Sequence, residues 1–311
     1  MSWRRWFAAV GAVWALFAAV GLAVFVTYWR LPADDLYNVG NEGLRDGASR
    51  LLVFVNYPVS LAAIPIAWLA AARLRTRGAV WAAVLMTALC AVTAGPGVVD
   101  QHDLDAKPIN VLPALGVVIA FALSIRAPWE PVGRRRLDPL RLVIAVLAVV
   151  AATPWIFAVL GFNAPGDVFL GEELRRGGDG QLAPAVHLGD HEGMDGVLLV
   201  LAALQLSRLR PRLLVAYVIG LMFVYGLGVA AQDDWNEQVV KRGWAGFKLP
   251  NMLHPTVNVT WLVVLVLAAV VALLLRRLEG PSPPGEDRPR SASSPSLGRP
   301  SGGSTTGAQS P

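Results

Sequence analysis

Three residues with metal-binding side chains, His187, His191 and Asp195, follow one another at intervals of four along the chain. In an α-helix this spacing places side chains on one face, so we expect a helix that begins at or before His187. Imidazole and carboxylate groups bind divalent cations such as Zn, Cu, Mn or Fe. The alternative is the solvated polar end of a helix, in which the histidines hydrogen-bond to Asp190, Glu192 or loop carbonyls.

Two further histidines are available to complete a metal site. His102 lies in a short acidic segment, and His254 directly precedes a proline that favours the start of a helix. We expect both at the same membrane face as the first pair, so that either one supplies a third or fourth ligand. Asp190 or Glu192 would then act as general base for a metal-bound water.

The segment from His187 to His191, His-Leu-Gly-Asp-His, resembles the His-x-x-x-His pair of a family of seven-helix membrane zinc hydrolases, the ceramidase and progestin-receptor-like group. That family combines the pair with an Asp and a further His. The resemblance covers five residues, and the early apolar segments contain no matching Ser/Asp set. It implies zinc-dependent hydrolysis and transfers no substrate.

The chain that positions these side chains is strongly apolar. Hydrophobic residues make up 55% of its 311 residues, and the mean hydropathy is +0.51. Such a composition, with long uncharged runs, is typical of a multi-pass membrane protein. We predict an all-α polytopic membrane helix bundle with about eight transmembrane helices. The expected spans are residues 6–29, 51–74, 80–98, 109–125, 140–162, 188–206, 213–231 and 257–275.

The sixth span contains the metal-ligand residues. Its uninterrupted apolar run, residues 197–206, is too short to cross a bilayer core of about 30 Å. We therefore extend this span upstream through Asp195 to Leu188. Gly189 and Gly193 lie four residues apart in that extension, with Gly196 close to the same face. This pattern predicts the close approach of a neighbouring helix.

The loops indicate the orientation. Arginines are concentrated in short connections such as residues 73–77 and 208–212, whereas the longer loops carry most of the acid. The positive-inside rule places the arginines and both termini in the cytoplasm and the acidic loops outside. It also accounts for the pI of about 9.8, so no nucleic-acid partner is needed. In the third outer loop we expect a short helix from Asp167 to Gly177.

Two parts of the chain differ in composition. Residues 1–280 are expected to form an integral membrane helical domain. Residues 281–311 are rich in Pro, Ser and Gly without an apolar face, which predicts a disordered cytoplasmic tail.

Composition and residue types also limit the function. Apart from the entrance of the sixth, the expected spans carry no Asp, Glu, Lys or Arg near their midplane, which argues against an ion-coupled carrier or pump. The single cysteine, Cys90, excludes an intramolecular disulfide. We expect a cell-membrane protein with an acidic, His-containing extracytoplasmic site, namely a metal-dependent enzyme acting on a lipid or lipid-linked substrate from the outer leaflet. The alternative is a non-catalytic permease, sensor or assembly protein that binds cations, a small molecule or another protein at this face.

Overall fold

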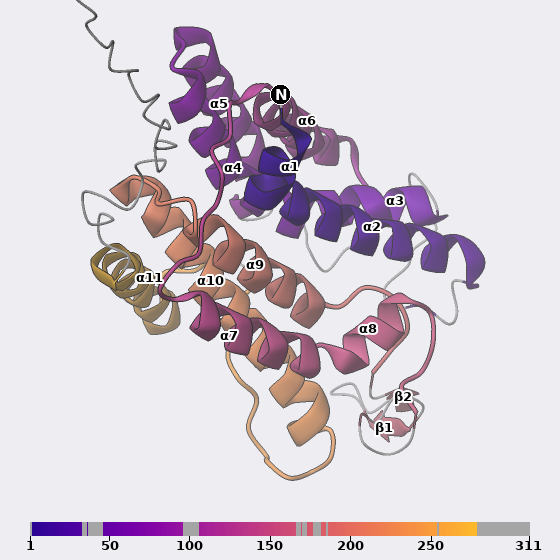
Figure 1. Cartoon of the computed structure of the whole chain (residues 1–311). Helices are drawn as coiled ribbons and strands as arrows, with labels where there is room; N and C mark the ends of the chain where they lie inside the picture. Colours follow the sequence, from indigo (N-terminus) through magenta and orange to yellow (C-terminus); the bar gives the residue numbers. More distant parts are fainter. Residues whose placement is uncertain are drawn as a thin grey trace, which may run out of the picture. The chain divides into compact units, whose positions relative to one another are not determined.

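The computed structural model describes residues 2–32, 36, 46–95, 106–165, 169, 173–176, 182–184, 186–253 and 255–278. This part of the chain is an all-α bundle with one short hairpin (Figure 1). The elements are, in order, α1 (Trp3–Trp6), η1 (Phe7–Gly11), α2 (Ala12–Arg30), α3 (Asp46–Phe54), η3 (Val55–Val59), α4 (Ser60–Leu74), α5 (Arg77–Ala91), η4 (Val92–Ala94), η5 (Pro108–Asn110), α6 (Val111–Arg126), α7 (Asp138–Ala151), α8 (Thr153–Val159), β1 (Leu174–Arg176), β2 (Leu182–Pro184), α9 (Glu192–Ser207), α10 (Leu213–Asp234), η6 (Trp235–Val240) and α11 (Val259–Leu278).

Several consecutive elements join into longer helices. Within the described residues five helices, four of them joined in this way, are long and apolar enough to cross a membrane: Trp3–Arg30, Gly47–Leu74, Pro108–Arg126, Leu213–Val240 and the single helix Val259–Leu278. Helices α7 and α8 are bent by 57° relative to each other and would make a sixth span if the pair crosses as one. The described chain therefore has the make-up of a multi-pass membrane protein.

Every one of the eight expected spans overlaps a helix, but two of these helices, in addition to the bent pair α7 and α8, are short. Helix α5 has 15 residues and α9 has 16, fewer than the roughly 20 that a bilayer core requires. The count of eight spans and the cytoplasmic location of the termini therefore stay predictions. The tail, residues 281–311, lies outside the described residues.

Local sequence features explain where the helices turn. Thr76 precedes α5, and its hydroxyl oxygen accepts a hydrogen bond from the Ala79 amide at 3.2 Å, which caps the helix. Helix α4 ends at Leu74, and the left-handed backbone of the next residue, Arg75, with a φ of 54°, leads directly into this cap. Pro154 lies in the first turn of α8 and cannot continue the hydrogen bonds of α7, which accounts for the bend.

The loop between α8 and α9, expected as the third outer loop, differs from the expectation. Leu174–Arg176 forms strand β1, which pairs antiparallel with β2 at Leu182–Pro184. The short helix predicted from Asp167 to Gly177 is therefore wrong over its last turn. Two strands separated by a glycine-containing segment satisfy each other's backbone groups, whereas one short isolated helix does not.

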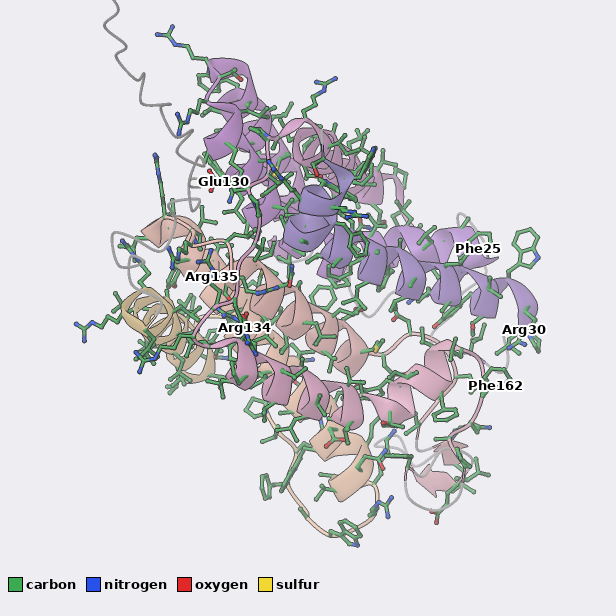
Figure 2. All side chains as sticks on the ribbon, in the orientation of Figure 1. Phe25, Arg30, Glu130, Arg134, Arg135 and Phe162 are labelled. Carbon is green, nitrogen blue, oxygen red and sulfur yellow. The ribbon has the colours of Figure 1, made fainter. Side chains whose placement is uncertain are left out.

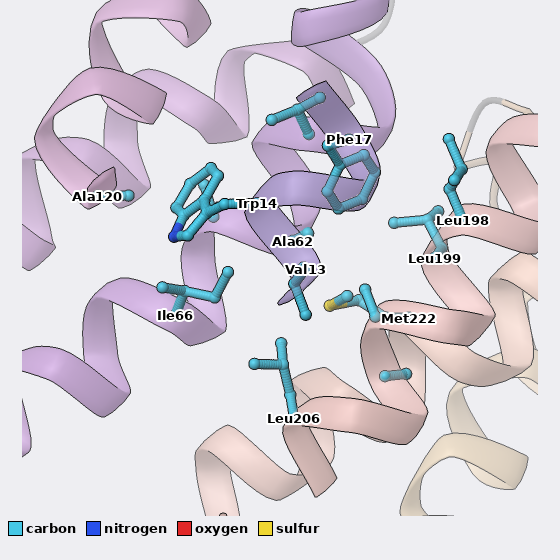
Figure 3. Packing of buried hydrophobic residues seen from close by; sticks show 14 of the residues in the cluster. Val13, Trp14, Phe17, Ala62, Ile66, Ala120, Leu198, Leu199, Leu206 and Met222 are labelled. Carbon is cyan, nitrogen blue, oxygen red and sulfur yellow. The ribbon is translucent and has the colours of Figure 1, made fainter. Parts of the chain in front are cut away.

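Helix α9 lies at the centre of the packing and contacts α2, α4, α7, α8 and α10. Figure 3 shows its Leu198, Leu199 and Leu206 facing residues of α2 and α10, including Val13 and Met222. Its approach to α10 depends on glycine: a Cβ atom on Gly196 would lie 2.5 Å from the Gly226 carbonyl oxygen, and the reverse contact is equally close. The predicted close helix approach is confirmed at Gly196.

Ion pairs fix the carboxyl end of α9. The Arg208 guanidinium contacts both carboxylate oxygens of Asp138, at 3.1 and 3.2 Å, and Asp138 also pairs with Arg141 at 3.1 Å. These contacts tie α9 to the start of α7, just after the connection on which Figure 2 labels Arg134 and Arg135. The amino end of α9, about 24 Å away at 1.5 Å per residue, borders the site described next.

Candidate metal centre

A polar cavity of about 400 Å³ lies where three parts of the chain meet. The first part is the start of the long helix Gly47–Leu74, and the second is the segment that leads into α9, with the first turn of α9. The third is the end of α10 with η6 and the loop that follows η6. The lining combines charged, polar and apolar side chains: Arg50, Val53, Phe54, Tyr57, His187, Asp190, His191, Glu192, Asp195, Gln232, Asp233, Asn236, Glu237, Lys241, Lys248, Asn251 and Leu253. Five residues selected from the sequence thus share one cavity: His187, Asp190, His191, Glu192 and Asp195.

The segment before α9 is not helical, which corrects the expected common helical face. Helix α9 begins at Glu192, and His191 has an extended backbone with φ −131° and ψ 138°. The amide of Gly189, whose φ is +108°, donates to the Ala158 carbonyl at 2.9 Å, and the Asp190 amide donates to the Tyr28 hydroxyl at 3.0 Å. Because these amides bond to other elements, they cannot continue α9 upstream, and residues 187–191 form a turn.

This turn nevertheless brings the two histidines together. The imidazole rings of His187 and His191 stack with their centroids 4.0 Å apart. The Nε2 atom of His191 lies 2.8 Å from the His187 carbonyl oxygen, which can only accept a hydrogen bond, so Nε2 carries the proton. In the neutral ring, Nδ1 then carries the available lone pair. This atom lies 3.5 Å from Glu237 Oε1 and 3.7 Å from Asp233 Oδ2. A backbone carbonyl that fixes the tautomer in this way is typical of metal-binding histidines.

Three potential ligands converge at this point: one atom each from His187, His191 and Glu237 lies within 4.8 Å of the others. In a tetrahedral zinc site, ligand atoms are roughly 3.3 to 3.6 Å apart, given metal–ligand bonds of about 2.0 to 2.2 Å. Side-chain shifts of about 1 Å would therefore close the group around an ion. His187 and His191 from the expected set are in it, and Asp195 is not.

Glu237 was not among the residues selected from the sequence, and it belongs to the π-helix η6 at the end of α10. Its Oε2 atom accepts a hydrogen bond from the Trp155 indole at 3.1 Å, and its Oε1 lies 3.7 Å from Lys241 Nζ. The indole contact orients the carboxylate so that Oε1 faces the imidazole of His191. The sequence signal was the pair Asp233 and Glu237, four residues apart in a helix that follows a long apolar run.

The electrostatic environments of the two histidines differ. Burial lowers the pKa of His187 well below its ordinary range, and the neighbouring imidazole of His191 lowers it further. Burial also acts to lower the pKa of His191, but the carboxylates of Glu237 and Asp233 outweigh this effect and raise it to about 9. His187 is thus neutral near pH 7, whereas His191 would have to release a proton to bind a metal ion.

The acidic residues selected from the sequence occupy distinct positions. Asp190 pairs with Arg50 at 3.6 Å, and its pKa is raised chiefly by burial. Glu192 is the first residue of α9 and lines the cavity. Asp195 is one turn further on and only 5% exposed, and among the described residues its Oδ1 atom has no hydrogen-bond partner. The remaining two metal candidates, His102 and His254, lie outside the described residues.

Comparison of the chain with protein-family models, with curated proteins and with solved structures finds no match. The function is therefore inferred from the geometry of the site.

Proposed function

We propose that this chain is a multi-pass protein of the cell membrane whose extracytoplasmic cavity binds a divalent metal ion at His187, His191 and Glu237. The observation that carries the proposal is the convergence of these three ligand atoms within 4.8 Å of one another in the wall of a polar cavity. Three protein ligands leave a coordination position open for water, as in catalytic rather than structural zinc sites. We therefore infer a metal-dependent enzyme.

The charges of the cavity support a divalent ion. Five carboxylates and three basic side chains line the cavity, so two negative charges are in excess when all five carboxylates are ionised and both histidines are neutral. Charges removed from water are costly unless they are compensated. One divalent cation compensates this excess, and a proton on His191 compensates half of it. Metal binding and protonation therefore compete at this imidazole.

The other lining residues suggest how the site would work. A bound metal ion would lower the pKa of its water, and Glu192, Asp190 or Asp195 would accept the proton as general base. Asp190 already pairs with Arg50, which favours Glu192 or Asp195 for this role. Val53, Phe54 and Leu253 add apolar side chains to the lining of the cavity, and Val53 and Phe54 belong to a helix that is long enough to cross a membrane. A lipid or lipid-linked substrate suits this combination.

A non-catalytic permease, sensor or assembly protein is the second candidate. It is favoured by the ion pairs of His191 with Glu237 and Asp233, which form a compensated network without any metal. In that case the cavity would bind a small molecule or another protein through its charges.

Metal analysis of the purified protein separates the two candidates. The unmodified chain in detergent should contain one Zn, Cu, Mn or Fe ion per molecule, and His187→Ala, His191→Ala and Glu237→Gln should each lose it. Glu173→Ala, which alters an exposed carboxylate outside the cavity, should retain the ion. Absence of metal from the unmodified chain, together with no metal-dependent rise in its melting temperature, would refute the enzyme and favour the second candidate.

A further inference from the structure

We infer that Arg50 forms an anion-binding subsite in the same cavity and that the substrate carries a phosphate group. This inference rests on the proposed function, because it places the phosphate beside the metal ion. It starts from the position of Arg50 in the second turn of α3, where the side chain is 2% exposed and lines the cavity.

The contacts of Arg50 leave much of its guanidinium uncommitted. The Nη2 atom lies 3.6 Å from Asp190 Oδ2, and the group stacks over the Tyr28 ring at 4.8 Å. Within the described part of the chain, Nε and Nη1 are buried and have no hydrogen-bond partner. Donors of a buried charge that lack acceptors cost free energy, so an anion that accepts their hydrogen bonds gains affinity at this position.

The other basic groups of the cavity indicate phosphate rather than a smaller anion. Lys248 and Lys241 line the cavity with Arg50, and the proposed metal ion would add a further positive centre. A phosphate group presents several acceptor oxygens and binds guanidinium and metal ions together. Asp195, whose buried Oδ1 has no partner among the described residues, offers an acceptor to a hydroxyl or amine of the same substrate.

Binding of phosphate probes to the metal-loaded full chain tests this inference. Inorganic phosphate and glycerol 3-phosphate would be titrated by calorimetry in detergent. Phosphatidic acid would be presented in phosphatidylcholine nanodiscs, with pure phosphatidylcholine nanodiscs as reference and the melting temperature as readout. Binding of the soluble probes supports a soluble phosphate source, and stabilisation by phosphatidic acid alone supports a lipid source.

Variants assign the binding to Arg50. Arg50→Gln should weaken the probe at least tenfold, and Arg50→Lys should weaken it less because it retains the charge and the fold. Arg30→Gln is the matched control: Arg30 also stacks on an aromatic ring, that of Phe162 at 5.4 Å (Figure 2), but it does not line the cavity. Its affinity for the probe should stay unchanged.

Metal content measured in the same samples separates the two possible failures. The phosphate inference is overturned, and the metal site stands, if the unmodified chain and Arg50→Gln both hold metal but neither binds a phosphate probe. Equal binding of the probe by all three arginine variants would also overturn it. If no sample holds metal, the proposed function fails instead.

Discussion

A single methyl group at Gly193 should disturb the proposed metal centre, although Gly193 is not one of its proposed ligands. Gly193 lies in the first turn of α9, and a Cβ atom there would overlap the Trp155 indole, with the Cε2 atom 2.6 Å away. Trp155 is 0% exposed, so the ring has no free space into which to move. The same indole donates the hydrogen bond that orients Glu237. Gly193→Ala should therefore displace the carboxylate ligand.

The expected magnitude follows from these contacts. Forcing an extra methyl into packed surroundings costs about 1–3 kcal/mol. Loss of the indole hydrogen bond to a charged acceptor costs about 1.5–3 kcal/mol. Disturbing a group that orients a ligand typically lowers metal affinity by about 10- to 100-fold. We expect Gly193→Ala to lose stability and to bind metal 10- to 100-fold more weakly.

A matched glycine separates this effect from helix propensity. Gly78 lies in the first turn of α5, and a Cβ atom there would have no neighbour within 4 Å. Gly78→Ala should be neutral or gain up to about 1 kcal/mol, because alanine favours helices over glycine. Metal affinity would be measured by competition with a chromogenic chelator, and stability by thermal unfolding in detergent. Unchanged metal affinity in Gly193→Ala would show that Trp155 does not hold Glu237 in place.

Two further predictions concern pH and topology. The pKa of His191, about 9, exceeds its ordinary value because of Glu237 and Asp233. Its contribution to stability is thus complete below about pH 6.5 and lost as the pH rises through 9. The melting temperature of the chelator-treated protein should fall across that interval, and a flat profile would contradict the ion pairs. Reporters inserted at residues 134–136 should report cytoplasm and one near Gly178 the outside; the reverse pattern would overturn the orientation.

The helices were predictable because each depends on its own stretch of sequence. An apolar run of sufficient length forms a helix in lipid regardless of its neighbours, since its backbone groups must bond internally. The start of α9 was not predictable in this way. Its upstream residues bond to Ala158 and to Tyr28, two elements far away in the sequence, and these bonds replace the helical ones that the spacing suggested.

Only some of the residues of the site could be predicted from the sequence, because the others come from distant parts of the chain. His187 and His191 were found because they are close in sequence, although a turn rather than a helix brings them together. Glu237 and Arg50 come from other elements, and no local pattern links them to the histidines. Both lie outside the expected spans, and only the three-dimensional packing of the helices shows that one cavity includes both.

The irregular helices at this cavity favour binding over a purely structural role. Residues from two π-helical segments line the cavity, Tyr57 from η3 and Glu237 from η6. A π-helical turn is less favourable than an α-helical one and is found frequently at functional sites. Pro58 accounts for the irregularity of η3, because a proline inside a helix removes an amide donor. No proline occurs in η6, so a proline does not explain this π-helical segment. Its irregular geometry instead directs the side chain of Glu237 toward His191.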